Sequence, residues 1–215
     1  MKLRELIRRI LLLVAVCAIQ AIYFPTSLRT SGGFAPKTAL DIIPIWPIWV
    51  LPYLSCFPMW ITAALWALWK MKTRMFNALM LACGMTFSLS IATFLLFPTY
   101  VERTPLTGED PFTKLLLWVY QTGGDYDALP SGHIYITSLL VFFYNLWKPA
   151  HQRIWWGILG IVSLTTLFTG QHYILDLLAG FAVAWIGYLF GIRMSGFKAE
   201  KLNGERASSI NASNP

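Results

Sequence analysis

Two short polar stretches organise this chain, and each leads directly into a long apolar run. The first is Pro130-Ser131-Gly132-His133, and the second is Thr169-Gly170-Gln171-His172-Tyr173-Ile174-Leu175-Asp176. Together they hold two of the three histidines in the protein. An apolar run that follows a polar loop predicts a helix that begins at the edge of a membrane. Both histidines are therefore expected at helix starts on a membrane surface, not inside a soluble core.

Composition supports a membrane protein. Hydrophobic residues make up 56% of the 215 residues and charged residues only 13%, whereas about a quarter of the residues in a soluble domain are charged. The hydrocarbon core of a bilayer needs roughly 20 apolar residues per helix. We therefore expect an all-α polytopic membrane protein with one domain over residues 1–197. Residues 198–215 are polar and are expected to form a disordered cytoplasmic tail.

Six apolar runs predict six transmembrane helices. They lie at about 10–24, 45–69, 75–97, 131–147, 154–168 and 173–193. The first run could instead be a cleaved signal peptide, but no small-x-small cleavage site follows it cleanly, so we favour a helix. Pro47, Pro52 and Pro58 are expected to kink the second span or to leave part of it re-entrant. Between spans three and four, residues 111–120 have the apolar content of a short interfacial helix.

The basic residues predict the orientation, because Lys and Arg accumulate in cytoplasmic segments of membrane proteins. With a cytoplasmic N-terminus, all of the 17 Lys and Arg residues fall in cytoplasmic segments except Arg29, Lys37, Arg103 and Lys114. Both termini are then cytoplasmic, and Arg103, His133 and His172 lie on the extracytoplasmic side. The net charge of +7 is thus a topology signal. A nucleic-acid partner is not expected, because the basic residues flank apolar runs and form no basic surface with interleaved aromatics.

The polar residues at these helix starts suggest phosphate chemistry. His172 and Asp176 are four positions apart, so they share one helical face. A carboxylate there can hold one imidazole nitrogen and leave the other free to attack or to exchange a proton. A helix-capping pair is the alternative, but an ionisable residue in a transmembrane segment is costly and usually functional. Ser131 and Gly132 offer either an anion site or a simple N-cap, and Arg103 offers a guanidinium for phosphate.

The motifs Pro-Ser-Gly-His and His-x-x-x-Asp resemble those of the type 2 phosphatidic acid phosphatase (PAP2) superfamily, which includes lipid phosphate phosphatases and vanadium haloperoxidases. The resemblance covers roughly residues 97–180. It implies a six-helix membrane bundle that uses no metal or other cofactor. It also implies that His172 attacks phosphorus to form a phosphohistidine, that Asp176 orients it, and that His133 protonates the leaving oxygen. By the same resemblance, phosphate oxygens would be bound by Ser131, Gly132 and Arg103.

Two cations of the family pattern are missing. Leu96 stands where the first motif has lysine, and that motif ends in Arg103-Thr104-Pro105 instead of Arg-Pro. The Ser-Arg that usually opens the third motif is replaced by Thr165 and Thr166. Phosphoryl transfer depends on neutralising charge at the phosphate oxygens, so we expect a phosphodiester to suit the site better than a monoester. Phe97-Pro98-Thr99, Gly124-Asp125-Tyr126 and His172-Tyr173-x-x-Asp176 resemble the branch that transfers head groups to sphingolipids, the inositol-phosphorylceramide and sphingomyelin synthases.

Three charged residues are candidate auxiliary groups. Lys114 could supply the missing positive charge, and Asp125 or Asp127 could bind an amine head group or assist proton transfer. For each of them, simple solvation in a loop is the alternative. Cys17, Cys56 and Cys83 lie in apolar segments, so neither a disulfide framework nor a zinc site is expected.

Three functions remain open on the sequence alone. The first is a membrane phosphatase or phosphotransferase that acts on lipid phosphate esters. The second is a transferase that moves a phosphodiester head group to a lipid alcohol, and the third is a non-catalytic membrane protein with the same fold. The expected partners are membrane lipids and a lipid phosphate substrate. The sequence does not indicate an oligomeric state.

Overall fold

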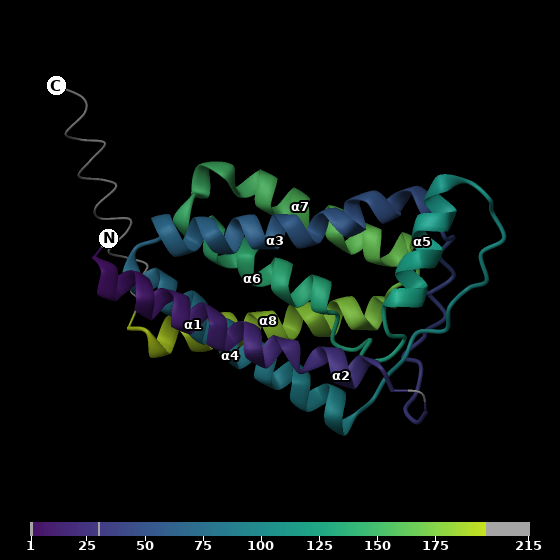
Figure 1. Ribbon diagram of the computed structural model, residues 1–215, viewed down its shortest axis with the longest axis horizontal. Coiled ribbons are helices and arrows are strands. Elements are labelled where there is room, and N and C mark those ends of the chain that lie inside the picture. The colour runs from purple at the N-terminus through teal and green to yellow at the C-terminus, as the bar shows by residue number, and fades with distance from the viewer. Residues whose placement is uncertain (1, 30, 197–215) are drawn as a thin grey trace.

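The computed structural model describes residues 2–29 and 31–196, and it is a bundle of helices (Figure 1). Its elements are α1 (Leu3–Ala21), α2 (Tyr23–Ser27), η1 (Pro47–Trp49), α3 (Val50–Lys70), α4 (Thr73–Leu96), α5 (Pro111–Thr122), α6 (Gly132–Trp147), η2 (Pro149–His151), α7 (Gln152–Phe168) and α8 (Ile174–Met194). No strand occurs in the described ranges, only two isolated bridges. The predicted all-helical class is confirmed. The predicted tail, residues 198–215, lies outside the described residues.

The long helices α1, α3, α4, α6, α7 and α8 run along a common direction, whereas α5 lies across one end of the bundle (Figure 1). We call this the α5 end. Helices α6 and α8 begin there, beside the loops that connect α2 to η1 and α4 to α5. Asp110 starts α5 by accepting hydrogen bonds from the backbone N–H groups of Phe112 and Thr113, as an N-cap residue does. The short helix expected at 111–120 is therefore present as α5.

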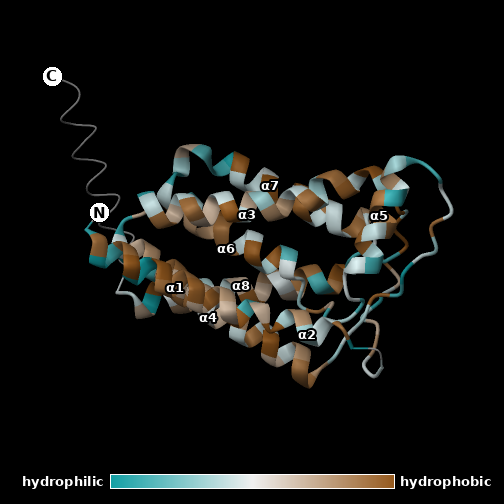
Figure 2. Ribbon diagram, in the orientation of Figure 1, coloured by the Kyte–Doolittle hydropathy of each residue, from teal (hydrophilic) through white to brown (hydrophobic). Residues whose placement is uncertain are grey.

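Four segments are long and apolar enough to cross a membrane: Leu3–Ser27, Pro47–Lys70, Thr73–Leu96 and Ile174–Met194. Helices α6 and α7 have 16 and 17 residues, fewer than the roughly 20 that a bilayer core requires. Six spans therefore stay a prediction. Hydrophobic residues line α1, α3 and α4, and hydrophilic ones gather toward the two ends of the bundle (Figure 2). These long apolar helices are consistent with an integral membrane protein.

The first apolar run is packed into the bundle through a buried arginine. Arg9 is only 4% exposed. Its guanidinium donates to the carbonyl oxygen of Leu68 at 2.8 Å, to Thr73 Oγ1 at 2.9 Å and to Glu5 at 2.9 Å. A buried charge requires such partners. This network fixes α1 to the connection between α3 and α4.

Helices α4 and α8 form the closest contact in the bundle core. A Cβ atom on Gly187 of α8 would clash with Thr86 Oγ1 and would lie 2.8 Å from the carbonyl oxygen of Ala82. Small residues allow this close approach of helix backbones, which is typical of membrane helices. In the proline-rich second run, η1 leads into a continuous α3 that has Pro58 inside it.

Candidate active site

The candidate site lies where α6 and α8 begin. The backbone N–H of Ser131, which precedes α6, donates to the carbonyl oxygen of Asp176 in α8 at 3.0 Å. A Cβ atom on Gly180 would lie 2.8 Å from the Ser131 carbonyl oxygen and 3.0 Å from Ile134 Cβ. The two helices therefore touch backbone to backbone. This contact brings the ring centroids of His133 and His172 to 5.8 Å from each other.

His172 is held by the aspartate four positions later. Its Nδ1 lies 3.3 Å from Asp176 Oδ2, and the same oxygen accepts the backbone N–H of Tyr173 at 2.8 Å. Asp176 is fully buried, and its other carboxylate oxygen has no hydrogen-bond partner among the described residues. The geometry fits a tautomer in which Nδ1–H faces the carboxylate, which leaves Nε2 as the nitrogen for chemistry.

His133 lies in a box of aromatic side chains from α3. Its ring centroid is 4.6 Å from that of Tyr53, 5.3 Å from that of Trp60 and 6.0 Å from that of Phe57. His133 Nε2 is buried and has no partner among the described residues. Sequence reasoning missed these three aromatics. Their spacing, i, i+4 and i+7, places them on one helical face. This periodicity in the sequence could have indicated that the three rings lie together.

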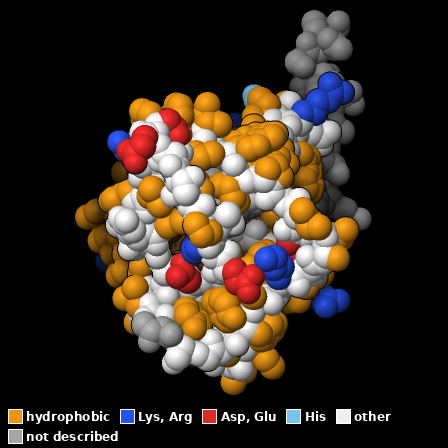
Figure 3. Space-filling model, turned by 90° about the vertical axis from the view of Figure 1, so that its right-hand side faces the viewer, with side chains coloured by type: hydrophobic (Ala, Val, Ile, Leu, Met, Phe, Trp, Pro, Cys, Tyr) orange, Lys and Arg blue, Asp and Glu red, His pale blue; other side chains and the backbone are white. Residues whose placement is uncertain are grey.

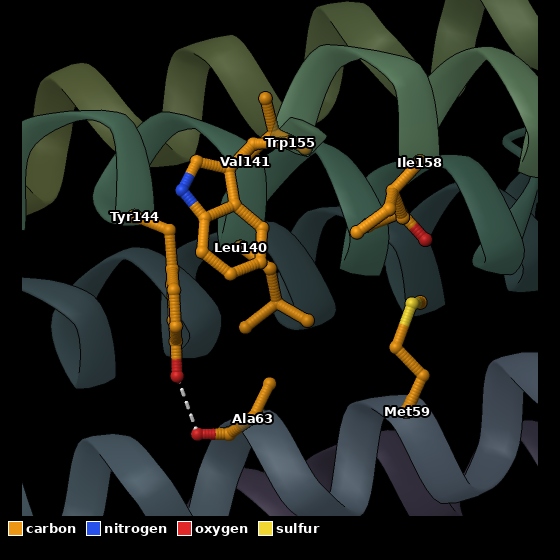
Figure 4. A pocket seen from close by; sticks show the side chains of 8 residues that line it. Met59, Ala63, Leu140, Val141, Tyr144, Trp155 and Ile158 are labelled. Carbon is orange, nitrogen blue, oxygen red and sulfur yellow. Dashed lines mark hydrogen bonds between the residues drawn. The ribbon is translucent and has the colours of Figure 1, made fainter. Parts of the chain in front are cut away.

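A small apolar crevice lies farther along α6, deeper in the bundle than this box. It lies between α3, α6 and α7 and is lined by Met59, Ala63, Thr137, Leu140, Val141, Tyr144, Trp155 and Ile158 (Figure 4). The Tyr144 hydroxyl donates to the carbonyl oxygen of Ala63 at 2.6 Å, and Thr137 Oγ1 accepts from Trp60 Nε1 at 3.1 Å. At 1.5 Å per helical residue, these positions on α6 lie about 6 to 16 Å beyond His133.

Arg103 is committed to the protein around it. Its Nε donates to Asp125 Oδ1 at 2.8 Å, Nη1 to the carbonyl oxygen of Gly170 at 2.8 Å, and Nη2 to that of Gly124 at 3.2 Å. The guanidinium also lies 4.6 Å above the ring of Tyr120. Three of the five N–H groups of a guanidinium are thus used within the fold. Arg103 supports the loop before His172.

Ser131 and Gly132 occupy the start of α6. The Ser131 hydroxyl is buried, makes no capping hydrogen bond, and has no partner in the described part of the chain. The simple N-cap alternative is therefore not observed. A Cβ atom on Gly132 would meet Tyr135 at an ordinary distance of 3.5 Å, so packing does not require glycine there.

The auxiliary candidates lie in different surroundings. Lys114 pairs with Glu109 at 3.0 Å, and both side chains are exposed. Asp125 pairs with Arg103. Asp127 is only 2% exposed and has a φ of 61°. Burial raises the pKa of the Asp127 carboxyl, and its neighbours Thr26 and Arg29 act in the opposite direction.

In the structure, the residues that replace the missing cations are also uncharged, and their side chains hydrogen-bond to no charged group among the described residues. Leu96 is exposed at the end of α4. Thr165 Oγ1 donates to the carbonyl oxygen of Trp49 at 2.6 Å, and Thr166 Oγ1 to that of Ser163 at 2.9 Å. The hydroxyl groups of both threonines therefore donate to backbone carbonyl oxygens. In the described residues no group of three His, Cys, Asp or Glu side chains is placed to hold a metal ion.

A loop aspartate that sequence reasoning missed also reaches α8. Asp41 Oδ1 accepts the backbone N–H of Ile174 at 2.8 Å, and Oδ2 accepts from Thr38. Partial burial acts to raise the pKa of Asp41, but the hydrogen bonds from Ile174 and Thr38 outweigh it and lower the pKa. Nothing local in the sequence links Asp41 to a helix so much later in the chain.

Figure 3 looks onto the α5 end, where acidic and basic side chains lie close together among hydrophobic ones.

The chain matches a known protein family. A family model described as the PAP2 superfamily matches residues 45–190, which is more than half of the chain. The matched range runs from η1 to α8 and contains both histidines, Asp176, Arg103 and Ser131. No curated protein matches the chain.

Proposed function

Because the chain belongs to the PAP2 superfamily, we propose that it is an integral-membrane enzyme that removes or transfers phosphate on lipids through a phosphohistidine at His172. One observation carries this proposal: His172 is held by a fully buried carboxylate and lies 5.8 Å, ring to ring, from a second histidine. A nucleophile, its orienting group and an acid are the set that nucleophilic catalysis needs.

The first half of the proposed reaction forms the phosphohistidine. Nε2 of His172 attacks phosphorus, the bond from phosphorus to the leaving oxygen breaks, and His133 donates a proton to that oxygen. Asp176 stabilises the positive charge that develops on the His172 ring. In the second half, water or an alcohol attacks phosphorus while giving its proton to His133. The phosphorus–nitrogen bond then breaks and His172 is restored.

The surroundings of His133 support a lipid as the substrate. The aromatic box and the crevice beyond it are apolar, and the polar groups of Tyr144, Thr137 and Trp60 are hydrogen-bonded to each other or to backbone. This apolar lining suits a hydrocarbon chain whose phosphate lies at the histidines. The crevice is narrow, so a chain would enter it by moving the lining side chains apart. The positive charge distribution further supports an extracytoplasmic position for the α5 end, with α6 and α7 as the fourth and fifth spans and α5 along the membrane interface.

A head-group transferase is the second candidate. It is favoured by the neutral residues at positions 96 and 166 and by the pairing of Arg103 with Asp125. A site with so little net positive charge suits a phosphodiester, which carries one negative charge. A phosphodiester lipid can transfer its phosphorylated head group to a lipid alcohol. That alcohol would replace water as the acceptor in the second half of the reaction.

The test compares the wild-type protein with His172→Ala and with His151→Ala. His151 is the third histidine and lies in η2, at the opposite end of the bundle, so it is the matched control. Each protein is incubated with lipid phosphomonoesters and phosphodiesters, with and without a lipid alcohol. We expect turnover and an acid-labile phosphoprotein in the wild type and His151→Ala, and neither in His172→Ala. Equal turnover in all three would refute the proposal.

The products separate the two candidate reactions. Phosphate released from monoesters without an acceptor indicates a phosphatase, and product that appears only with the lipid alcohol indicates a transferase. The orientation is tested separately by cysteine substitution at Ser31, in the loop between α2 and η1. A membrane-impermeant maleimide applied outside intact cells is expected to label Ser31→Cys, and labelling only after lysis would reverse the assigned topology.

A further inference from the structure

We propose that Asp125 determines whether the site prefers a singly or a doubly charged phosphate ester. Its carboxylate pairs with Arg103 and thereby disfavours a doubly charged phosphomonoester. This inference rests on the proposed function and adds a specificity-determining residue to it. Asp125 does not touch the histidines in any hydrogen bond of the described residues. It acts through the arginine that would otherwise bind phosphate.

The geometry of the Arg103 guanidinium supports this role. Bidentate binding of a phosphate needs two neighbouring N–H groups along one edge of the guanidinium. In this structure Nε faces Asp125, and Nη1 and Nη2 each donate to a backbone carbonyl, of Gly170 and Gly124 respectively. An incoming phosphate must therefore compete with the Asp125 carboxylate or accept single contacts from the remaining N–H groups.

The charges around Arg103 make this competition decisive. Leu96 and Thr166 leave two positions neutral, and Lys114 and Lys37 are paired with Glu109 and Glu102. Among the described residues at the α5 end, the Asp125 carboxylate thus neutralises the guanidinium nearest the His172 loop. A second negative charge on the substrate would be repelled by this carboxylate. The remaining described cation of this end, Arg29, donates to the carbonyl oxygen of Phe94 in α4 and acts on Asp127.

Asp125 is also suited to be replaced without disturbing the fold. Its side chain is about half exposed, with 53% of its surface accessible, whereas the Arg103 side chain is 15% exposed. The structural contact of Asp125 is made by its backbone, whose carbonyl oxygen accepts from the Val101 N–H at 3.0 Å. Asparagine keeps that contact and can still accept from Arg103, so the substitution removes only the charge.

The test measures the ratio of kcat/KM for a phosphomonoester and a phosphodiester with the same acyl chains. In the wild type the ratio is expected to fall as the pH rises through the second ionisation of the monoester, near pH 6. In Asp125→Asn the ratio at pH 7.5 is expected to rise about tenfold and to lose most of that pH dependence. Effects of histidine titration on the two substrates cancel in the ratio.

Glu102→Gln is the matched control. It removes one negative charge from the same end of the bundle, but the Glu102 side chain pairs with Lys37 at 3.1 Å, and the partners of the Arg103 side chain are Asp125, Gly170 and Gly124. Its ratio is expected to equal that of the wild type. An unchanged ratio in Asp125→Asn, or an equal change in Glu102→Gln, would overturn the inference.

A binding measurement keeps the inference testable even if the chain turns over neither ester. Dissociation constants for inorganic phosphate and for dimethyl phosphate are measured by calorimetry at pH 7.5, in a His172→Ala background. We expect Asp125→Asn to tighten the binding of inorganic phosphate by about tenfold more than the binding of dimethyl phosphate. Equal effects on the two anions would refute the role of Asp125, whereas absent turnover with the expected binding would refute only the proposed reaction.

Discussion

Asp176→Asn removes one negative charge beside His172 and keeps the shape of the side chain. The Asp176 oxygen that faces His172 also accepts the Tyr173 backbone N–H at 2.8 Å. An asparagine oxygen can make both contacts. The other carboxylate oxygen of Asp176 has no partner among the described residues, so the new NH2 group meets no competing donor. We therefore expect the variant to fold while the His172 ring loses its charged partner.

The size of the effect follows from that contact. A hydrogen bond to a charged group contributes about 1.5 to 3 kcal/mol, which corresponds to a loss of about 10- to 150-fold in the rate of phosphohistidine formation. If the asparagine amide turns its NH2 group toward Nδ1, the imidazole is held in the wrong tautomer, and the loss can approach about 10⁴-fold. The measurement is the rate at which radiolabelled lipid phosphate transfers to the protein in a single turnover.

Asp41→Asn is the control for this experiment. Like Asp176, Asp41 accepts a backbone N–H at the start of α8, that of Ile174 at 2.8 Å, but among the described residues no hydrogen bond or ion pair joins it to His172. Its transfer rate should match that of the wild type. The reasoning fails if Asp176→Asn forms phosphohistidine within about threefold of the wild-type rate, or if Asp41→Asn loses as much as Asp176→Asn.

Three further predictions concern packing, pH and the crevice. Gly187→Ala should lower the free energy of unfolding by about 1 to 3 kcal/mol because the added Cβ would meet α4. Gly160→Ala should not lower it, because no atom lies within 4 Å of the added Cβ. Unfolding in detergent measures the stability of both variants. Because burial raises the pKa of Asp127, its carboxyl costs stability as the pH rises above about 4, and Asp127→Asn should flatten that loss in melts between pH 4 and 8. Val141→Phe fills the crevice and should lower kcat/KM for long-chain esters about tenfold more than for short-chain esters, and an equal effect on both would contradict a chain site there.

The sequence predicted those parts of the site that depend on local spacing. His172 and Asp176 lie within one helical turn, and the helix starts at Gly132 and Ile174 follow directly from polar-to-apolar transitions. The same local signals placed α5 correctly, where Asp110 caps the first turn. These features require no knowledge of which helices are neighbours.

The features that sequence reasoning missed depend on distant contacts. The sequence predicts Arg103 as a site residue, but its partners Asp125 and Gly170 are 22 and 67 positions away, and no local pattern indicates that they accept hydrogen bonds from its guanidinium. Asp41 reaches Ile174 across 133 positions. The aromatic box around His133 needed the packing of α3 against α6, although the periodicity of Tyr53, Phe57 and Trp60 could have shown that they share a face.

The backbone contact between α6 and α8 has a consequence for how this site can change. The spacing of the two histidines is set by main-chain atoms, through the Ser131 N–H to Asp176 carbonyl bond and the absence of a side chain at Gly180. In the proposed reaction, side chains that contact the substrate can therefore vary without altering the distance between His133 and His172. Adding a single methyl group at position 180 would instead push α6 and α8 apart and separate the two histidines while leaving both of them intact. If the proposed reaction holds, substrate preference and the spacing of the two histidines depend on different atoms, so selection or design can alter the first without disturbing the second.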